Sequence, residues 1–186
     1  MAITGVDHTS FTVSNLERSL EFYSGVLGFE FLWRRETKNE YFRAIVGLPD
    51  CVVQAAHLRI PGTTHKIELF EYVVPRGHAA DVRNNNFGSA HLGLYVDDLF
   101  EMYNTLRGRG VEFRSPPILI DAGVNTGGYA VYLLDPDGIT IELFQLPPPH
   151  TIMSTLAHIR HLNPSRLNFV SPPTTRLQLP NSMSKN

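Results

Sequence analysis

The feature that most constrains this chain of 186 residues is a four-residue sequence, Ile-Glu-Leu-Phe, that occurs twice. Its glutamates are Glu68 in the first copy and Glu142 in the second. Upstream of each copy a histidine opens an apolar segment, His8 before the first and His91 before the second. This repeated order of His and Glu indicates an internal duplication, with two imidazoles and two carboxylates at matching points of two halves.

The pattern of apolar residues gives both halves a strand, a helix and then further strands. Period-two segments predict strands and period-3.6 segments predict helices, with Ser14 or Asn15 and then Asp97 as helix N-caps. The first half is predicted to contain a strand at 6–13, a helix at 16–27 and strands at 29–35, 52–60 and 65–73. The second half is predicted to contain a strand at 90–96, a helix at 98–107 and strands at 111–114, 118–120, 129–134 and 139–146. Segment 36–50 is mixed and gives no clear element. The prediction is an α+β fold in which two βαβββ modules form a curved mixed sheet around a cavity.

Composition shifts divide the chain into four parts. Residues 1–74 form the first module, the polar segment 75–89 is a connector, and residues 90–147 form the second module. Residues 148–186 are a proline-rich C-terminal extension with little periodicity, which we expect to be poorly ordered.

Composition also excludes several classes of function. The net charge of −2 provides no electrostatic footprint for nucleic acid or an anionic membrane. No apolar run reaches the length of about 18 residues that a spanning helix requires, and the N-terminus lacks the layout of a secretory signal. Cys51 is the only cysteine, which fits a cytoplasmic location and a buried, structural thiol.

Strand alternation predicts that the four repeated residues share one face of the sheet. Neighbouring side chains along a strand point to opposite faces, so Ile67 and Leu69 oppose Glu68, and the second copy repeats this around Glu142. The aliphatic face should pack on the helices. The histidines and glutamates then lie together on the other face, where the sheet curves around a cavity.

Three further residues are candidates for a substrate pocket. The turn Asp-Pro-Asp-Gly at 135–138 predicts a hairpin that pairs Tyr132 with Glu142 on the cavity face. There the phenol can orient the carboxylate or contact a substrate. Ser10 shares the strand face of His8, and Arg43 is a candidate cation in segment 36–50.

Two His and two Glu suit a divalent ion such as Fe²⁺, Mn²⁺, Ni²⁺, Co²⁺ or Zn²⁺. Four protein ligands leave two octahedral positions for water or for a small substrate that binds through oxygen. Such an ion polarises a carbonyl, and Glu142 or Glu68 is then the candidate general base.

The quoted sequences together resemble the vicinal oxygen chelate superfamily over roughly residues 3–147. The resemblance rests on three stretches of sequence. The first is His8 with the Asn-Leu-Glu-Arg-Ser-Leu-Glu-Phe-Tyr that follows it, and the second is His91 with Val-Asp-Asp-Leu. The third is Asp-Pro-Asp-Gly-Ile-Thr-Ile-Glu, which ends at Glu142. It implies paired βαβββ modules around a metal held by His8, Glu68, His91 and Glu142, commonly in a homodimer.

Glu68 is the residue that separates members of this superfamily. In the superfamily that this sequence resembles, dioxygenases and fosfomycin-type transferases bind the metal with only two His and one Glu. Glyoxalase I and the epimerases add a fourth metal ligand, and Glu68 matches its position. We therefore expect a glyoxalase-like lyase, isomerase or epimerase that transfers a proton on a metal-chelated oxygen substrate. One alternative is an Fe(II) extradiol ring-cleaving dioxygenase, which Tyr132 favours. The other is a bleomycin-resistance-like protein that binds a small molecule without chemistry.

Overall fold

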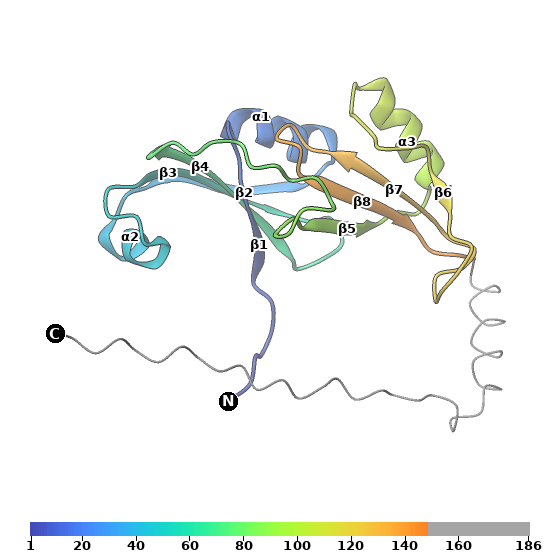
Figure 1. Ribbon diagram of the computed structural model, residues 1–186, viewed down its shortest axis with the longest axis horizontal. Coiled ribbons are helices and arrows are strands. Elements are labelled where there is room, and N and C mark those ends of the chain that lie inside the picture. Colours follow the sequence, from blue (N-terminus) through green and yellow to red (C-terminus); the bar gives the residue numbers. More distant parts are fainter. Residues whose placement is uncertain (149–186) are drawn as a thin grey trace. The chain divides into compact units, whose positions relative to one another are not determined.

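The computed structural model describes residues 1–148, which fold into two four-stranded mixed sheets of the same topology (Figure 1). The first sheet has the order β1-β4-β3-β2 and the second β5-β8-β7-β6. In each sheet one pair of neighbouring strands is parallel, β1 with β4 in the first sheet and β5 with β8 in the second. The other neighbouring strands are antiparallel. The predicted α+β fold with two βαβββ modules is confirmed.

The elements of the first module are β1 (His8–Thr12), α1 (Leu16–Leu20), a π-helical continuation η1 (Glu21–Val26), β2 (Glu30–Thr37), α2 (Glu40–Val46), β3 (Val52–Arg59) and β4 (Lys66–Val74). The elements of the second module are β5 (His91–Tyr95), α3 (Leu99–Gly108), β6 (Ile118–Leu119), β7 (Tyr129–Leu134) and β8 (Thr140–Gln145).

The helix of the first module begins and ends where its sequence indicates. The Asn15 side chain accepts a hydrogen bond from the Arg18 amide and so caps the first turn. Gly28 follows the helix with φ of 76°, a left-handed conformation that glycine adopts without steric cost. Leu16 and Tyr23 are buried on the face of this helix that packs on the sheet.

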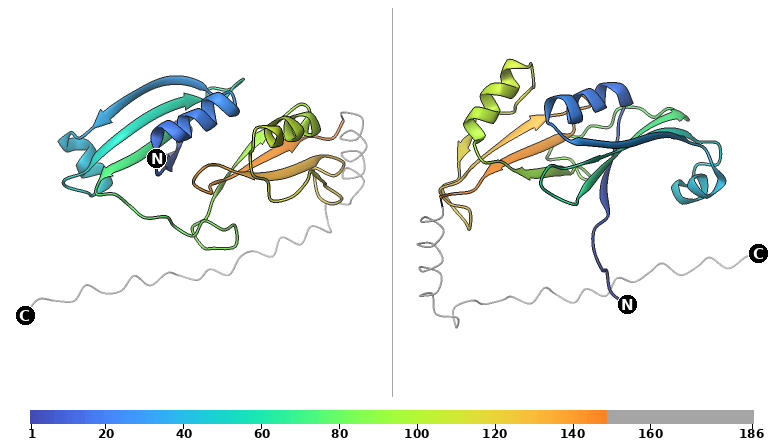
Figure 2. Two further views of the ribbon diagram at one scale, coloured as in Figure 1. Left: turned by 90° about the horizontal axis from the view of Figure 1, so that it is seen from above. Right: turned by 180° about the vertical axis from the view of Figure 1, so that it is seen from behind.

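The aliphatic faces of both sheets meet the helices in a shared hydrophobic core. The strand residues at its centre are 0–1% exposed, and they come from matching positions of the two repeated sequences: Ile67, Leu69, Ile141 and Leu143. Two views of the ribbon show α1 and α3 each lying against its own sheet (Figure 2). Glu68 and Glu142 therefore point away from this core, because they lie between buried neighbours on their strands.

The structure differs from the sequence-based expectation at three places. Helix α2 occupies segment 36–50, for which no element was predicted; Asn39 caps it, and Gly47 ends it with φ of 70°. The cap of α3 is Asp98 rather than Asp97, since the Asp98 side chain accepts from the Glu101 amide. The expected strand at 111–114 is reduced to an isolated bridge between Phe113 and Leu133.

Helix α2 covers the face of the first sheet opposite to α1 (Figure 1). Phe42 of α2 lies on a second, smaller cluster of buried residues that includes Cys51, Val53 and Ala55, and its ring meets that of Phe70 edge-on at 5.5 Å. Cys51 is fully buried, as expected. The face that carries Glu68 is therefore closed at one end by an apolar wall.

The two modules are joined by polar contacts as well as by the core. The buried Tyr23 hydroxyl donates to Asp135 Oδ2 at 3.0 Å. Arg18 forms an ion pair with Asp137, and the Ser14 amide donates to the same carboxylate. The hairpin turn of the second module is thereby fixed to the helix of the first.

Among the described residues, no helix combines the length and apolarity needed to cross a membrane. The predicted C-terminal extension lies outside the described residues, apart from Pro148.

Candidate functional site

The first half of the site is centred on Glu68, whose two carboxylate oxygens have different partners. His8 Nε2 lies 3.2 Å from Oε2, and His57 Nε2 lies 2.8 Å from Oε1. An ionised carboxylate only accepts hydrogen bonds, so His57 donates through Nε2. Glu68 is thus held between two imidazoles on the sheet face that the core leaves free.

Strand register brings these side chains together. Glu68 pairs with Ser10 on one neighbouring strand and with His57 on the other, so the three residues form a row across β1, β4 and β3. His8 lies two residues before Ser10 and therefore on the same face. Trp33 continues the row on β2, because it pairs with His57.

Asp7 fixes the other ring nitrogen of His8. Its Oδ2 lies 2.8 Å from His8 Nδ1, and Lys66 Nζ lies 2.9 Å from its Oδ1. The hydrogen bond to His8, followed by that to Lys66, lowers the pKa of Asp7 from 3.8 to about 2. The carboxylate is therefore ionised across the neutral range and directs Nε2 of His8 toward Glu68.

The second half of the site has the same backbone arrangement with different neighbours. His91 Nε2 lies 3.3 Å from Glu142 Oε2, and Gly93 occupies the register position of Ser10. Tyr132 pairs with Glu142, as predicted, and its ring centre lies 5.3 Å from that of His91. Desolvation, and then the charge of Glu142, raises the pKa of the Tyr132 phenol, which therefore stays protonated at neutral pH.

His57 is the site residue that the sequence analysis missed. It occupies in the first module the position that Tyr132 occupies in the second, opposite the repeated glutamate. The pairing could have been read from the sequence, because counting back across the turn at residues 61–64 places His57 opposite Glu68. The same count across the turn at 135–138 had identified Tyr132.

The structure assembles the four predicted ligands as two separate pairs. Between residues 1 and 148, no group of three or more His, Cys, Asp or Glu side chains is arranged to hold a metal ion. Each pair nevertheless has donors that suit one, namely an imidazole nitrogen and a carboxylate oxygen about 3 Å apart. The chemistry of the donors fits a divalent ion, and a complete site requires both pairs to meet.

The two remaining candidates for the substrate pocket have different surroundings. Ser10 is exposed beside Glu68. Arg43 lies on α2, where its Nε donates to the backbone carbonyl of Cys51 at 3.2 Å. This contact ties α2 to the residue that precedes β3, so the structure gives the guanidinium a role in holding that helix.

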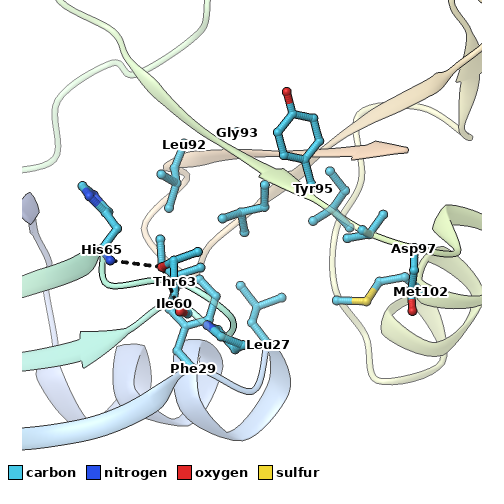
Figure 3. Close-up of a pocket in the computed structure, with 14 residues that line it drawn as sticks. Leu27, Phe29, Ile60, Thr63, His65, Leu92, Gly93, Tyr95, Asp97 and Met102 are labelled. Carbon is cyan, nitrogen blue, oxygen red and sulfur yellow. Dashed lines mark hydrogen bonds between the residues drawn. The ribbon is translucent and has the colours of Figure 1, made fainter. Parts of the chain in front are cut away.

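Two cavities are lined by residues of both β5 and β8. One, of about 180 Å³, is lined by Glu142, Gly93, Phe144 and Asn125 of the 120–128 loop, so this loop and the predicted base border the same cavity. The other is larger, about 600 Å³, and is lined mainly by apolar side chains such as Leu27 and Leu92 (Figure 3). None of the four predicted ligands lines this larger cavity.

Comparison with known proteins identifies the family. Residues 5–143 match the model of the Glyoxalase/Bleomycin resistance protein/Dioxygenase superfamily. The chain belongs to this superfamily, and the resemblance noted in the sequence is thereby confirmed.

Two curated relatives and one solved structure illustrate the range of similar proteins. A 2-epi-5-epi-valiolone epimerase of an Actinomyces species is 30% identical over 76% of this chain and 79% of the relative. A probable lactoylglutathione lyase of Vibrio cholerae is 27% identical over 77% of this chain and 91% of the relative. A glyoxalase family protein of Bacillus cereus shares the fold, with a TM-score of 0.70 and 22% identity over 80% of this chain and 97% of its own. The relatives support an enzyme of this superfamily.

Proposed function

We propose that this protein is a divalent-metal-dependent enzyme of the glyoxalase type, an epimerase or a lyase that transfers a proton on a small substrate chelated through oxygen. The metal ligands in this proposal are His8, Glu68, His91 and Glu142. The observation that carries it is the equivalent placement of two His–Glu pairs in two modules of one topology. The presence of Glu68 favours proton transfer over ring cleavage, and the similarity to an epimerase and a lyase points the same way.

In this proposal the site's side chains have different roles in the reaction. A divalent ion held by the four ligands supplies Lewis acidity to a substrate oxygen. Glu142 is the candidate base, because it faces the cavity lined by Asn125 and its one ion-pair partner among the described residues is His91. The Tyr132 phenol, protonated at neutral pH, is placed to donate a hydrogen bond to substrate oxygen.

The reaction class is tested in deuterated water with purified, metal-analysed protein. We expect solvent deuterium to enter the carbon next to the carbonyl of a 2-oxo or hemithioacetal substrate, at a rate that depends on bound metal. Glu142→Gln should lower that rate about 10²–10⁴-fold at saturating metal, as expected for loss of a general base. A protein that retains no metal and binds ligands unchanged without it would refute the enzyme proposal and favour a binding protein.

We further propose that two copies of the chain complete each metal site. The first module of one copy then faces the second module of its partner, and the dimer contains two equivalent sites. This arrangement reconciles the donor chemistry of the two pairs with their separation within residues 1–148. It also agrees with the dimer that the sequence resemblance implies.

Mixing two inactive variants tests this arrangement directly. In a heterodimer of His8→Ala and His91→Ala chains, a shared arrangement leaves one site with both substitutions and one site with neither. Random exchange of subunits should therefore restore about a quarter of the wild-type sites. If each chain built its own site, mixing would restore nothing, although the dimer would still be seen by size-exclusion chromatography.

An Fe(II) extradiol dioxygenase is the second candidate, and Tyr132 is the observation that favours it. The phenol lies beside both His91 and Glu142 on the site face. After anaerobic loading with Fe²⁺, oxygen uptake with catechols would identify this activity. Deuterium exchange without oxygen uptake would exclude it.

A further inference from the structure

We propose that His57 is a positioning residue that holds Glu68 by one oxygen and so keeps its other oxygen facing His8. This inference rests on the proposed function, since it gives Glu68 a defined orientation toward a metal. It concerns a residue outside the four ligands, on a strand that contributes none of them.

The division of the two Glu68 oxygens is the first support. His57 Nε2 donates to Oε1 at 2.8 Å, and Oε2 lies 3.2 Å from His8 Nε2. A carboxylate with only one partner rotates about its last torsion, which is broad and poorly defined by itself. The hydrogen bond from His57 removes this freedom and leaves Oε2 on the side of His8.

His57 is itself held in place, which a positioning residue requires. Its ring stacks on Trp33 with centroids 4.2 Å apart and an interplanar angle of 27°. The guanidinium of Arg35 lies 4.7 Å from the centre of the Trp33 ring. His57 is only 9% exposed, so its hydrogen bond to Glu68 is shielded from competing water.

The second module serves as an internal comparison. Tyr132 occupies the position of His57 there, and within residues 1–148 no hydrogen bond joins its hydroxyl to Glu142. Glu142 is also the more exposed carboxylate, at 22% against 14% for Glu68. The duplicated site thus has one carboxylate fixed by a neighbouring side chain and one that is freer to move.

The test compares three variants of the full-length protein by Co²⁺ binding. His57→Phe keeps a ring to stack on Trp33 but removes the donor, whereas His57→Gln keeps a donor and removes the ring. His78→Gln, an exposed histidine of the connector, is the control. Isothermal titration with Co²⁺ gives the affinity, and the visible absorption of bound Co²⁺ reports its ligands. Calorimetric unfolding of the metal-free proteins confirms that each variant folds.

We expect His57→Phe to weaken Co²⁺ binding about 10–100-fold and to change the absorption spectrum, as loss of a partner of a metal ligand does. His57→Gln should recover most of the affinity, and His78→Gln should match the wild type. If His57→Phe bound Co²⁺ with wild-type affinity while Glu68→Gln bound it more weakly, the positioning role of His57 would be refuted and the proposed function would stand. An equal loss in His57→Gln and His57→Phe would also overturn that role, because a donor would then not suffice. A wild-type protein that binds no Co²⁺ would instead refute the proposed function.

Discussion

Two glutamates in identical four-residue sequences have different surroundings in this molecule. Glu68 lies between His8 and His57, whereas Glu142 faces a cavity and contacts His91. The repeated sequence predicted their common sheet face, because alternation along a strand is a local property. The repeat itself does not contain this asymmetry, because the partner of each carboxylate lies on a neighbouring strand, and finding His57 required counting back across the turn at residues 61–64.

This difference gives a prediction for the two carboxylates. Glu68→Gln should mainly weaken metal retention, because it removes a fixed ligand charge. Glu142→Gln should mainly lower the rate of proton transfer once the protein is saturated with metal. Metal titration measures the affinity of each variant, and deuterium exchange measures its rate of proton transfer. If the two variants lost affinity equally and also lost rate equally, the two glutamates would not have different roles.

A second prediction at the residue scale concerns Asp135, which is 5% exposed at the hairpin turn of the second module. Burial raises its pKa above the ordinary value of 3.8, although backbone amides and Tyr23 donate to it. The folded state therefore holds this proton more tightly than the unfolded state. The resulting stabilisation is present below pH 3.8 and is lost as the pH rises through the raised pKa.

Asp135→Asn removes this titration while keeping an oxygen that accepts the two backbone amides. Urea unfolding at a series of pH values should show the stability of the wild type falling relative to the variant as the pH rises above 3.8. A constant difference between the two proteins across this range would show that Asp135 has the same pKa in both states.

Among the helices and strands, the sequence correctly predicted the elements whose apolar period and capping residues indicate the same boundaries. Helix α1 begins after Asn15, its continuation η1 ends two residues before Gly28, and the strand Tyr129–Leu134 was predicted with both ends correct. Helix α2 was missed because its seven residues are too few to show a clear period, and its stability comes from Phe42 packing on the sheet. The strand expected at 111–114 does not form, because this segment pairs with β7 only through the single bridge between Phe113 and Leu133.

The loop that brings Asn125 to the cavity depends on a close backbone approach at Gly128. A Cβ atom at this position would lie 2.6 Å from the carbonyl oxygen of Gln145 and 3.1 Å from that of Asn125. Gly128→Ala should therefore shift this loop and destabilise the fold by about 1–3 kcal/mol, the range for overpacking.

Thermal or urea unfolding measures this cost, with Gly77→Ala as the matched control. A Cβ atom at Gly77 meets nothing within 4 Å, and the control should stay within about 0.5 kcal/mol of the wild type. Equal stability of Gly128→Ala and the control would show that the loop accommodates a methyl group.

For the whole molecule, the two modules share one core and are joined by a buried hydrogen bond between Tyr23 and Asp135. The duplication predicted two modules of one topology, because each half repeats the same order of elements. It could not predict whether the two His–Glu pairs meet, because nothing in a strand pattern encodes the contact between one module and another. This is why the ligand set remains a prediction while the fold is confirmed.

The shared core predicts that residues 1–148 unfold in one cooperative step. Tyr23→Phe removes the hydroxyl that donates to Asp135 across the two modules and should cost about 1–3 kcal/mol, because a buried acceptor loses its partner. Calorimetry should show a single endotherm at a lower temperature. Two separated endotherms would indicate that the modules fold independently.

The stack of Trp33 on His57 has a practical consequence. Trp33 is the only tryptophan of the chain, and His57 alone separates it from Glu68. A paramagnetic ion such as Mn²⁺, Co²⁺ or Ni²⁺ at Glu68 should quench its fluorescence, whereas Zn²⁺ should not. Trp33 belongs to the first module and the second module contains no tryptophan, so the emission reports occupancy at the first module's carboxylate. The protein therefore carries its own optical probe of metal loading.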